Sequence, residues 1–171
     1  MKLKAFRLFR SWFRKDDGGA LAELAIMVPF LVLMLAAVSE FGRYFQNYNT
    51  LAKATRDSAR YLSNHNLDAS EQARAVSLVV CGKLACAAGD PPLVTGLTSS
   101  NVCLESTGSP KITSVTVKIP YQASDCNPMT GAVAATPYTY TPIFDLGALL
   151  GVSYSMAWPI APSTTMYYMI D

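Results

Sequence analysis

The longest apolar stretch of the chain covers residues 19–38, close to the N-terminus. At a rise of about 1.5 Å per residue, roughly 20 apolar residues suffice for a helix that crosses a bilayer. Two residues stand out here, because Glu23 places a charge near the start and Pro29 removes a helical hydrogen bond. The pattern predicts one membrane-spanning helix, with a carboxylate that any functional interpretation has to explain.

After residue 38 the apolar side chains recur at every third or fourth position instead of running continuously. This spacing is typical of one face of an amphipathic helix. The positions are Phe41, Tyr44, Phe45, Tyr48, Leu51, Ala52, Thr55, Ala59 and Leu62. We therefore expect one helix over residues 20–63, with its outer half packed against the rest of the chain. Its aromatic residues are expected at the membrane interface and in the core of the head.

A second helix is predicted to begin after Asp68. Its carboxylate can accept from the exposed amides of a first turn, and Glu71, three residues later, completes the pattern of a capping box. Gly82 is a natural C-terminal stop. Residues 83–100 are rich in Gly, Pro, Ser and Thr and are expected to form a loop.

The remainder of the chain carries strand patterns. Residues 101–106 could form a short strand, and apolar and polar residues alternate more clearly over 114–121 and 152–158. Residues 143–150 suggest an apolar turn or short helix. The two clearer strands are expected to pair antiparallel and to cover the helix face. The predicted fold class is α+β, with a long N-terminal membrane-spanning helix packed against a small antiparallel sheet.

Charge is unevenly distributed along the chain. Six of the 14 basic residues precede the first acidic residue, Asp16, and these are Lys2, Lys4, Arg7, Arg10, Arg14 and Lys15. Basic residues beside a hydrophobic segment stay in the cytoplasm, which predicts a cytoplasmic N-terminus and an exported C-terminal part. This leader could lie as a helix on the membrane surface or be a disordered topology signal. The rest of the chain has no basic patch, so we expect no nucleic-acid partner.

The four cysteines all lie in the predicted exported part, at Cys81, Cys86, Cys103 and Cys126. An even number in an oxidising compartment favours two disulfides, with three possible pairings. A zinc site with four thiolates is the less favoured alternative, because the spacing lacks the paired C-x2-C knuckles typical of such sites.

Catalysis is not predicted. The one histidine, His65, lies among asparagines at the expected end of the first helix, and no serine has a nucleophile motif around it. The carboxylates are scattered rather than paired, and no phosphate-binding loop is present. We therefore expect a protein that is not an enzyme and needs no cofactor.

The position of Glu23 suggests how its charge could be used. If a peptidase cuts between Gly18 and Gly19, the new chain begins with a positively charged amine, and Glu23 is its fifth residue. The carboxylate then lies one helical turn from that amine and could pair with it in the same chain or in a neighbouring one. The same cut would remove the basic leader. The alternative is that Glu23 lies near the inner interface and reaches water there.

These features resemble type IV pilin-like precursors and, more closely, the TadE/TadG-like family of tight-adherence (Flp) pilus assembly proteins. The motifs that carry the resemblance are Gly18 to Phe30 with Glu23 and Pro29, then Glu40-Phe41-Gly42-Arg43, then the Ala54 to Tyr61 segment with Arg56, Ala59 and Arg60. The similarity is specific over residues 18–61 and looser over 112–160. Leu24 stands where an aromatic residue often follows the glutamate, and Gly19 stands where Ala is more usual.

The resemblance implies a function in assembly. The expected protein is a minor pseudopilin of a Tad (Flp) type IV pilus or a related secretion system, anchored in the bacterial inner membrane with a pilin-like periplasmic head. Its implied parts are a basic leader (1–18), a transmembrane segment (19–38) and a head (39–171). The implied partners are inner-membrane lipid, other pilin-like subunits, the pilus assembly platform and a prepilin peptidase.

Two other functions are compatible with the same residues. Ala37-Val38-Ser39 could be a signal peptidase site before Glu40, which would release a secreted binding domain. The apolar face that begins at Phe41 argues against this, because the cut would separate that face from its anchor. The chain could also be a membrane-anchored periplasmic structural protein with no role in a pilus.

Overall fold

The computed structural model describes residues 17–132, 135–144, 147, 151, 155 and 157–170. The chain divides into two compact units, Met1–Phe41 and Gly42–Asp171. We describe each unit by itself, and within the first unit the description begins at Asp17.

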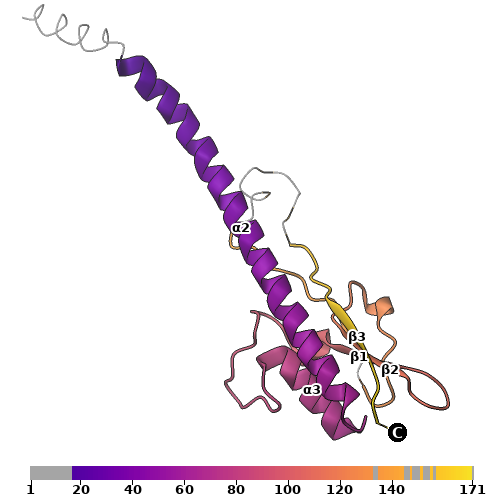
Figure 1. Cartoon of the computed structure of the whole chain (residues 1–171). Helices are drawn as coiled ribbons and strands as arrows, with labels where there is room; N and C mark the ends of the chain where they lie inside the picture. The colour runs from indigo at the N-terminus through magenta and orange to yellow at the C-terminus, as the bar shows by residue number, and fades with distance from the viewer. Residues whose placement is uncertain are drawn as a thin grey trace, which may run out of the picture. The chain divides into compact units, whose positions relative to one another are not determined.

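The first described element is α2 (Asp17–Ser63), a helix of 47 residues (Figure 1). It continues through Pro29 and agrees with the helix predicted over 20–63. In the first unit most of its apolar side chains are exposed, among them Leu21, Ile26 and Leu35. Among the described residues, this is the one helix long and apolar enough to cross a membrane.

In the second unit, α2 contributes its apolar face to a core. Leu51, Ala54, Ala59 and Leu62 are buried there. Phe45 and Tyr48, which belong to the same predicted face, remain exposed. The predicted packing face is therefore confirmed from Leu51 onward, and before Leu51 the half-buried Tyr44 also packs against the core.

The second helix, α3 (Ala69–Cys81), lies alongside the last turns of α2 (Figure 1). The Asp68 carboxylate accepts from the backbone N–H of Glu71, and Gly82 ends the helix with a φ of 71°. Both predicted ends are confirmed. The Glu71 side chain does not complete the predicted capping box but accepts from the Tyr61 hydroxyl and the Arg74 guanidinium, which links α2 to α3.

Three strands form one antiparallel sheet with the order β1-β2-β3: β1 (Cys103–Thr107), β2 (Ser114–Lys118) and β3 (Ser163–Tyr167). Cys103 pairs with Lys118 in the first ladder, and Ser114 pairs with Tyr167 in the second. On β2, the inward residues Val115 and Val117 are buried, as the alternation predicted. The α+β fold class, a long helix with a small antiparallel sheet, is confirmed.

The partner predicted for β2 was wrong. The sequence indicated a strand over 152–158, whereas β2 lies between β1 and β3, which begins at Ser163. Most of 152–158, and most of the turn expected over 143–150, lies outside the described residues. Trp158 belongs to no strand of the sheet. Its carbonyl accepts from the Tyr140 N–H, and the Ile160 N–H donates to the Tyr138 carbonyl. Threonine at two of the five β3 positions weakened the apolar alternation that would have indicated this strand.

Among its described residues, the second unit also contains two short 3-10 helices, η1 (Ser99–Asn101) and η2 (Ala123–Asp125). The core lies between the last turns of α2, α3 and the sheet. Its fully buried members include Leu51, Leu62, Leu104, Ile119 and Ile160.

Candidate functional site on the N-terminal helix

The predicted cleavage position lies in the first turn of α2. The helix begins at Asp17, so Gly18 and Gly19 are its second and third residues. Gly19 and Glu23 are four positions apart, which places them on the same helix face. A terminal amine created at Gly19 would therefore lie on the face that carries Glu23.

Glu23 is exposed in the first unit, and the apolar side chains that flank it are exposed as well. Leu24, Ile26 and Met27 lie beside Glu23 on the helix surface. Such an arrangement is unfavourable in water, because a wide apolar surface faces the solvent. In lipid the apolar side chains are favourable, but the Glu23 carboxylate is unfavourable as long as its charge has no partner.

Pro29 lies within α2, at the centre of the apolar segment that covers residues 19–38. Its ring nitrogen carries no N–H, so the carbonyl of Ala25 lacks its helical donor. The helix nevertheless continues to Ser63 without a break. Lipid-facing helices tolerate proline through small local adjustments, so Pro29 is compatible with an anchor.

The motif Glu40-Phe41-Gly42-Arg43 lies where the chain divides into its two units. Glu40 is 1% exposed, whereas Phe41 and Arg43 are exposed. A buried carboxylate is uncommon, because desolvation disfavours its charged form. The sequence pointed to this position only through the family motif.

The motif from Ala54 to Arg60 separates into a buried and an exposed set. Ala54 and Ala59 are buried, and the neighbouring Ser58 hydroxyl donates to the Ala75 carbonyl of α3 at 2.8 Å. These small residues allow α3 to approach α2 closely. Arg56 and Arg60 point outward, and neither makes an ion pair with a residue that the structure describes. The motif thus combines a helix-packing function with two cations on the surface.

Tyr44 anchors an aromatic cluster in the second unit. Its ring lies edge-on to Tyr140 and Trp158, with centroid distances of 5.7 and 6.2 Å, and its hydroxyl donates to the Pro159 carbonyl at 3.2 Å. Of the four aromatic residues expected at the membrane interface or in the core, Tyr44 packs against the core. Phe41, Phe45 and Tyr48 are exposed.

The four cysteines form two disulfides, Cys81–Cys86 and Cys103–Cys126, with Cα separations of 6.1 and 5.9 Å. The disulfides expected from the compartment are present, and the structure selects one of the three pairings. The first closes a short loop after α3. The second ties the start of β1 to the residue that follows η2.

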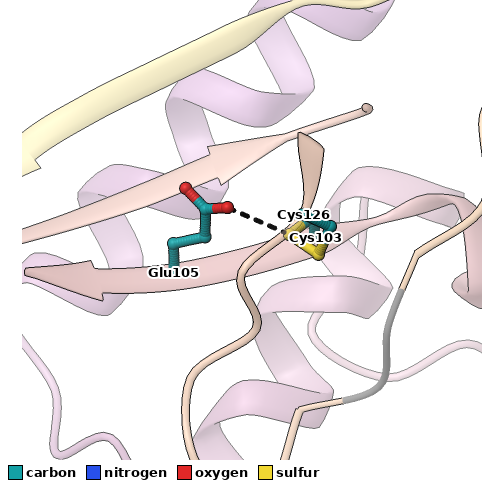
Figure 2. Close-up of side chains that lie close together, drawn as sticks. All are labelled: Cys103, Glu105 and Cys126. Carbon is teal, nitrogen blue, oxygen red and sulfur yellow. Dashed lines mark hydrogen bonds between the residues drawn. A yellow bond between two sulfur atoms is a disulfide. The ribbon is translucent and has the colours of Figure 1, made fainter. Parts of the chain in front are cut away.

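Glu105 lies beside the second disulfide, with Oε1 3.7 Å from Cys103 Sγ (Figure 2). The bonded sulfur carries no proton, so this is a contact rather than a donated hydrogen bond. Glu105 Oε1 accepts from Asn127 N–H at 2.7 Å and pairs with Lys118 Nζ at 2.7 Å. Cys103, Glu105 and Cys126 are close enough to suggest a metal site. Two bonded sulfurs leave no thiolate ligand there, so the cluster braces the sheet instead.

The contacts of His65 hold the end of α2 in place. Its ring stacks on Tyr61 with a centroid distance of 4.0 Å, and Nδ1 lies 2.8 Å from the Tyr61 carbonyl. The Tyr168 hydroxyl donates to the His65 carbonyl at 3.2 Å. These contacts fasten the end of α2 to the C-terminal segment, and the ring faces no carboxylate or serine in them.

Comparison with known protein families gives one match, and it falls on α2. The sequence profile of the family described as TadE-like protein matches residues 18–60, which begin at Gly18 and end at Arg60. No curated protein and no solved structure matches the chain. The TadE-like family implies an assembly protein of Tad pili with an N-terminal hydrophobic helix, structural rather than catalytic. Residues 18–60 of this chain form a TadE-like protein family domain.

Proposed function

We propose that this chain is a minor pseudopilin or assembly protein of a Tad (Flp) type IV pilus or a related secretion system. The observation that carries the proposal is the match over residues 18–60, which contains both Gly18 and Glu23. The apolar part of α2 would anchor the protein, and the exposed side chains between Leu21 and Val38 suit a lipid environment.

The proposed topology follows from charge and disulfides. The basic leader, residues 1–18, lies in the cytoplasm, residues 19–38 cross the bacterial inner membrane, and residues 39–171 form a periplasmic head. The two disulfides support an oxidising compartment for that head.

In this function Glu23 sets the register of the helix against neighbouring pilin-like subunits. After cleavage before Gly19, the terminal amine and the Glu23 carboxylate lie on one helix face and can pair within or between chains. Arg56 and Arg60, which are exposed on the head portion of α2, are proposed contacts to acidic surfaces of sibling subunits. The assembly platform and a prepilin peptidase are the other proposed partners.

The mature N-terminus is the first test. Mass spectrometry of the protein isolated from its membrane is expected to show a chain that begins at Gly19. A chain that begins at Glu40 would instead indicate a released domain, although α2 runs unbroken through Ala37 and Ser39. An intact leader would contradict the cleavage and the pairing of Glu23 with a new amine.

The charge of Glu23 is the second test. Glu23→Gln keeps the shape of the side chain and removes its charge, so we expect piliation to fall at least about tenfold, which corresponds to about 1.4 kcal/mol. Pili are counted by electron microscopy. Leu24→Phe, a neighbouring change that keeps Glu23, is the control and should leave piliation unchanged. Normal piliation in Glu23→Gln, at an equal membrane level of the protein, would contradict the register function.

A further inference from the structure

The C-terminal segment of the head runs along α2 in the same direction as the helix. Three contacts within the second unit join the two, and the residue numbers rise together on both sides. They join Tyr44 to Pro159, Thr55 to Thr164 and Ser63 to Met169, with distances between polar atoms of 3.2, 3.4 and 2.9 Å. The chain around Pro159 therefore lies beside the first turns of α2 in this unit, and Met169 lies at the opposite end.

Exposed apolar side chains flank those first turns of the second unit. Tyr44 packs edge-on against Tyr140 and Trp158 and so holds two distant segments beside α2. The residues next to these contacts that expose a large apolar side chain are here called the apolar rim, and they are Phe45, Ile143, Phe144 and Trp158. Three of them are more than half exposed, and Trp158 is 41% exposed. Exposed apolar surface of this kind marks a contact with a partner or a membrane.

The chain that contributes three of the four rim residues is almost free of charge. Residues 126–170 contain a single charged residue, Asp145, and no lysine or arginine. The part of α2 that follows the rim differs, because it exposes Lys53, Arg56 and Arg60. Charge is thus scarce near the rim and frequent further along the helix, which is the distribution expected at the boundary between lipid and water.

The rim is also close to the expected end of the membrane span. Tyr44 follows Val38 by six residues, which is about 9 Å of helix. Side chains on a helix lean toward its N-terminus, which is here the direction of the membrane. The headgroup region of one leaflet is about 5–8 Å thick, and tryptophan and tyrosine are enriched there. The rings at the start of the second unit are therefore within reach of lipid headgroups.

We propose that the apolar rim of the head inserts into the headgroup region of the leaflet that faces the head. The partner is the bilayer surface itself, and the rim gives the head a second attachment beside the helix that anchors it. This inference rests on the membrane anchor of the proposed function. It adds that residues distant in the sequence, held by Tyr44, fix how the head lies on the membrane.

The fluorescence of Trp158 tests the proposal directly. The chain has two tryptophans, so Trp12→Phe leaves Trp158 as the sole one without a change in the head. The full chain is reconstituted as a single copy per nanodisc, which excludes a neighbouring subunit as the cover of the rim. Lipids brominated near the headgroup end of their acyl chains are compared with unbrominated lipids. We expect Trp158 to be quenched at least about twofold, because bromine quenches a ring at that depth.

Two reference variants separate the rim from the anchor, each with both native tryptophans replaced by phenylalanine. Phe30→Trp reports on the anchor and should be quenched, and Tyr167→Trp reports on the opposite end of the head and should not. The proposal is overturned, with the anchor intact, if Phe30→Trp is quenched and Trp158 is quenched no more than Tyr167→Trp. If Phe30→Trp is not quenched either, the anchor itself is wrong and the rim proposal fails with it.

A matched pair of charge substitutions tests the rim residues, both in the Trp12→Phe chain. Ile143→Glu with Phe144→Glu places two carboxylates on the rim and should lower the quenching of Trp158 at least about twofold, because charge resists transfer from water. Tyr167→Glu with Met169→Glu makes the same change on two exposed residues at the opposite end and should leave the quenching unchanged. Undiminished quenching in the rim variant, or an equal loss in both variants, would contradict insertion of the rim.

Discussion

The two parts of α2 use the same kind of side chain in opposite ways. From Leu21 to Val38 the apolar residues surround the helix, and all but Leu33, Ala36 and Ala37 are exposed. From Leu51 to Leu62 they lie along one face and are buried in a core. One continuous helix thus passes from a part that is apolar all round to a part that is amphipathic.

The difference shows that helix formation and burial are separate properties of this sequence. A helix that is apolar on all sides is stable only in the core of a large protein or in a bilayer. The first unit provides no such core around residues 19–38 in the part of the chain that the structure describes. In the second unit, Lys53, Arg56 and Arg60 keep the outer face of the helix in water while Leu51 and Ala59 pack inward.

Matched leucine substitutions test this comparison most directly. Leu62 is 0% exposed and Leu31 is 55% exposed. Leu62→Ala is expected to lower the unfolding free energy of the head by about 2–5 kcal/mol, because it removes transfer energy and leaves a cavity. Leu31→Ala should change it by less than about 0.5 kcal/mol. Urea titration of the full chain in nanodiscs, followed by near-UV circular dichroism, measures both.

Equal destabilisation by the two leucine variants would break the comparison, since it would mean that the first part of α2 also supports the head. A second measurement tests the first part of α2 in the membrane, by following how readily the protein is extracted from it. Leu31→Arg should weaken retention in the bilayer, where an arginine at a helix centre costs about 2.5–3.5 kcal/mol.

The disulfides offer a further test of the difference between the two parts of α2, because both lie in the second unit and should stabilise only that unit. The Cys103–Cys126 bridge spans 23 positions and the Cys81–Cys86 bridge spans 5. Chain-entropy estimates give losses of about 3 kcal/mol for Cys103→Ala with Cys126→Ala, and about 2 kcal/mol for Cys81→Ala with Cys86→Ala. Both double variants should remain anchored in the membrane. Equal losses in urea titrations would show that loop length is not the controlling factor.

Much of the helical structure could be predicted from local sequence. Periodicity indicated α2, and the Asp68 and Gly82 signals set the ends of α3, because caps depend on residues within one turn. β3 was missed because its inward positions, Thr164 and Met166, carry little apolar contrast with their neighbours. Its place in the sheet depends on pairing with β2, which is distant in the sequence.

The candidate site was predictable only in part. The spacing of Gly18 and Glu23 is local and could be read directly, and the family match begins at that glycine. The disulfide pairing, the links of Glu105 and the packing of Tyr44 against Trp158 depend on contacts between distant segments. No local pattern encodes which of those segments meet.

The smallest expected effect concerns the cap of α3. The pKa of Asp68 is lowered, chiefly by the hydrogen bond from Glu71 N–H and to a smaller extent by that from the Ser70 hydroxyl. The pKa of Asp90 is lowered as well, chiefly by the bond from Lys83 and to a smaller extent by that from Ala87 N–H. A carboxylate whose pKa is lower in the folded than in the unfolded state stabilises the fold above its unfolded pKa, near 3.8. That contribution is lost as the pH falls through the folded pKa.

The urea midpoint of the head should therefore decrease as the pH is lowered from 5 to 2. Asp68→Asn keeps a good capping side chain but has no charge to titrate, so it should flatten the decrease while leaving the midpoint at pH 7 nearly unchanged. Asp68→Ala removes the cap itself and should lower the midpoint at every pH. If Asp68→Asn showed the same slope as the wild type, the acid sensitivity would come from other carboxylates, with Asp90 the first to replace. The helical structure of α2 over residues 19–38 should be insensitive to the fall in pH and to both variants, because the cap belongs to α3 in the second unit.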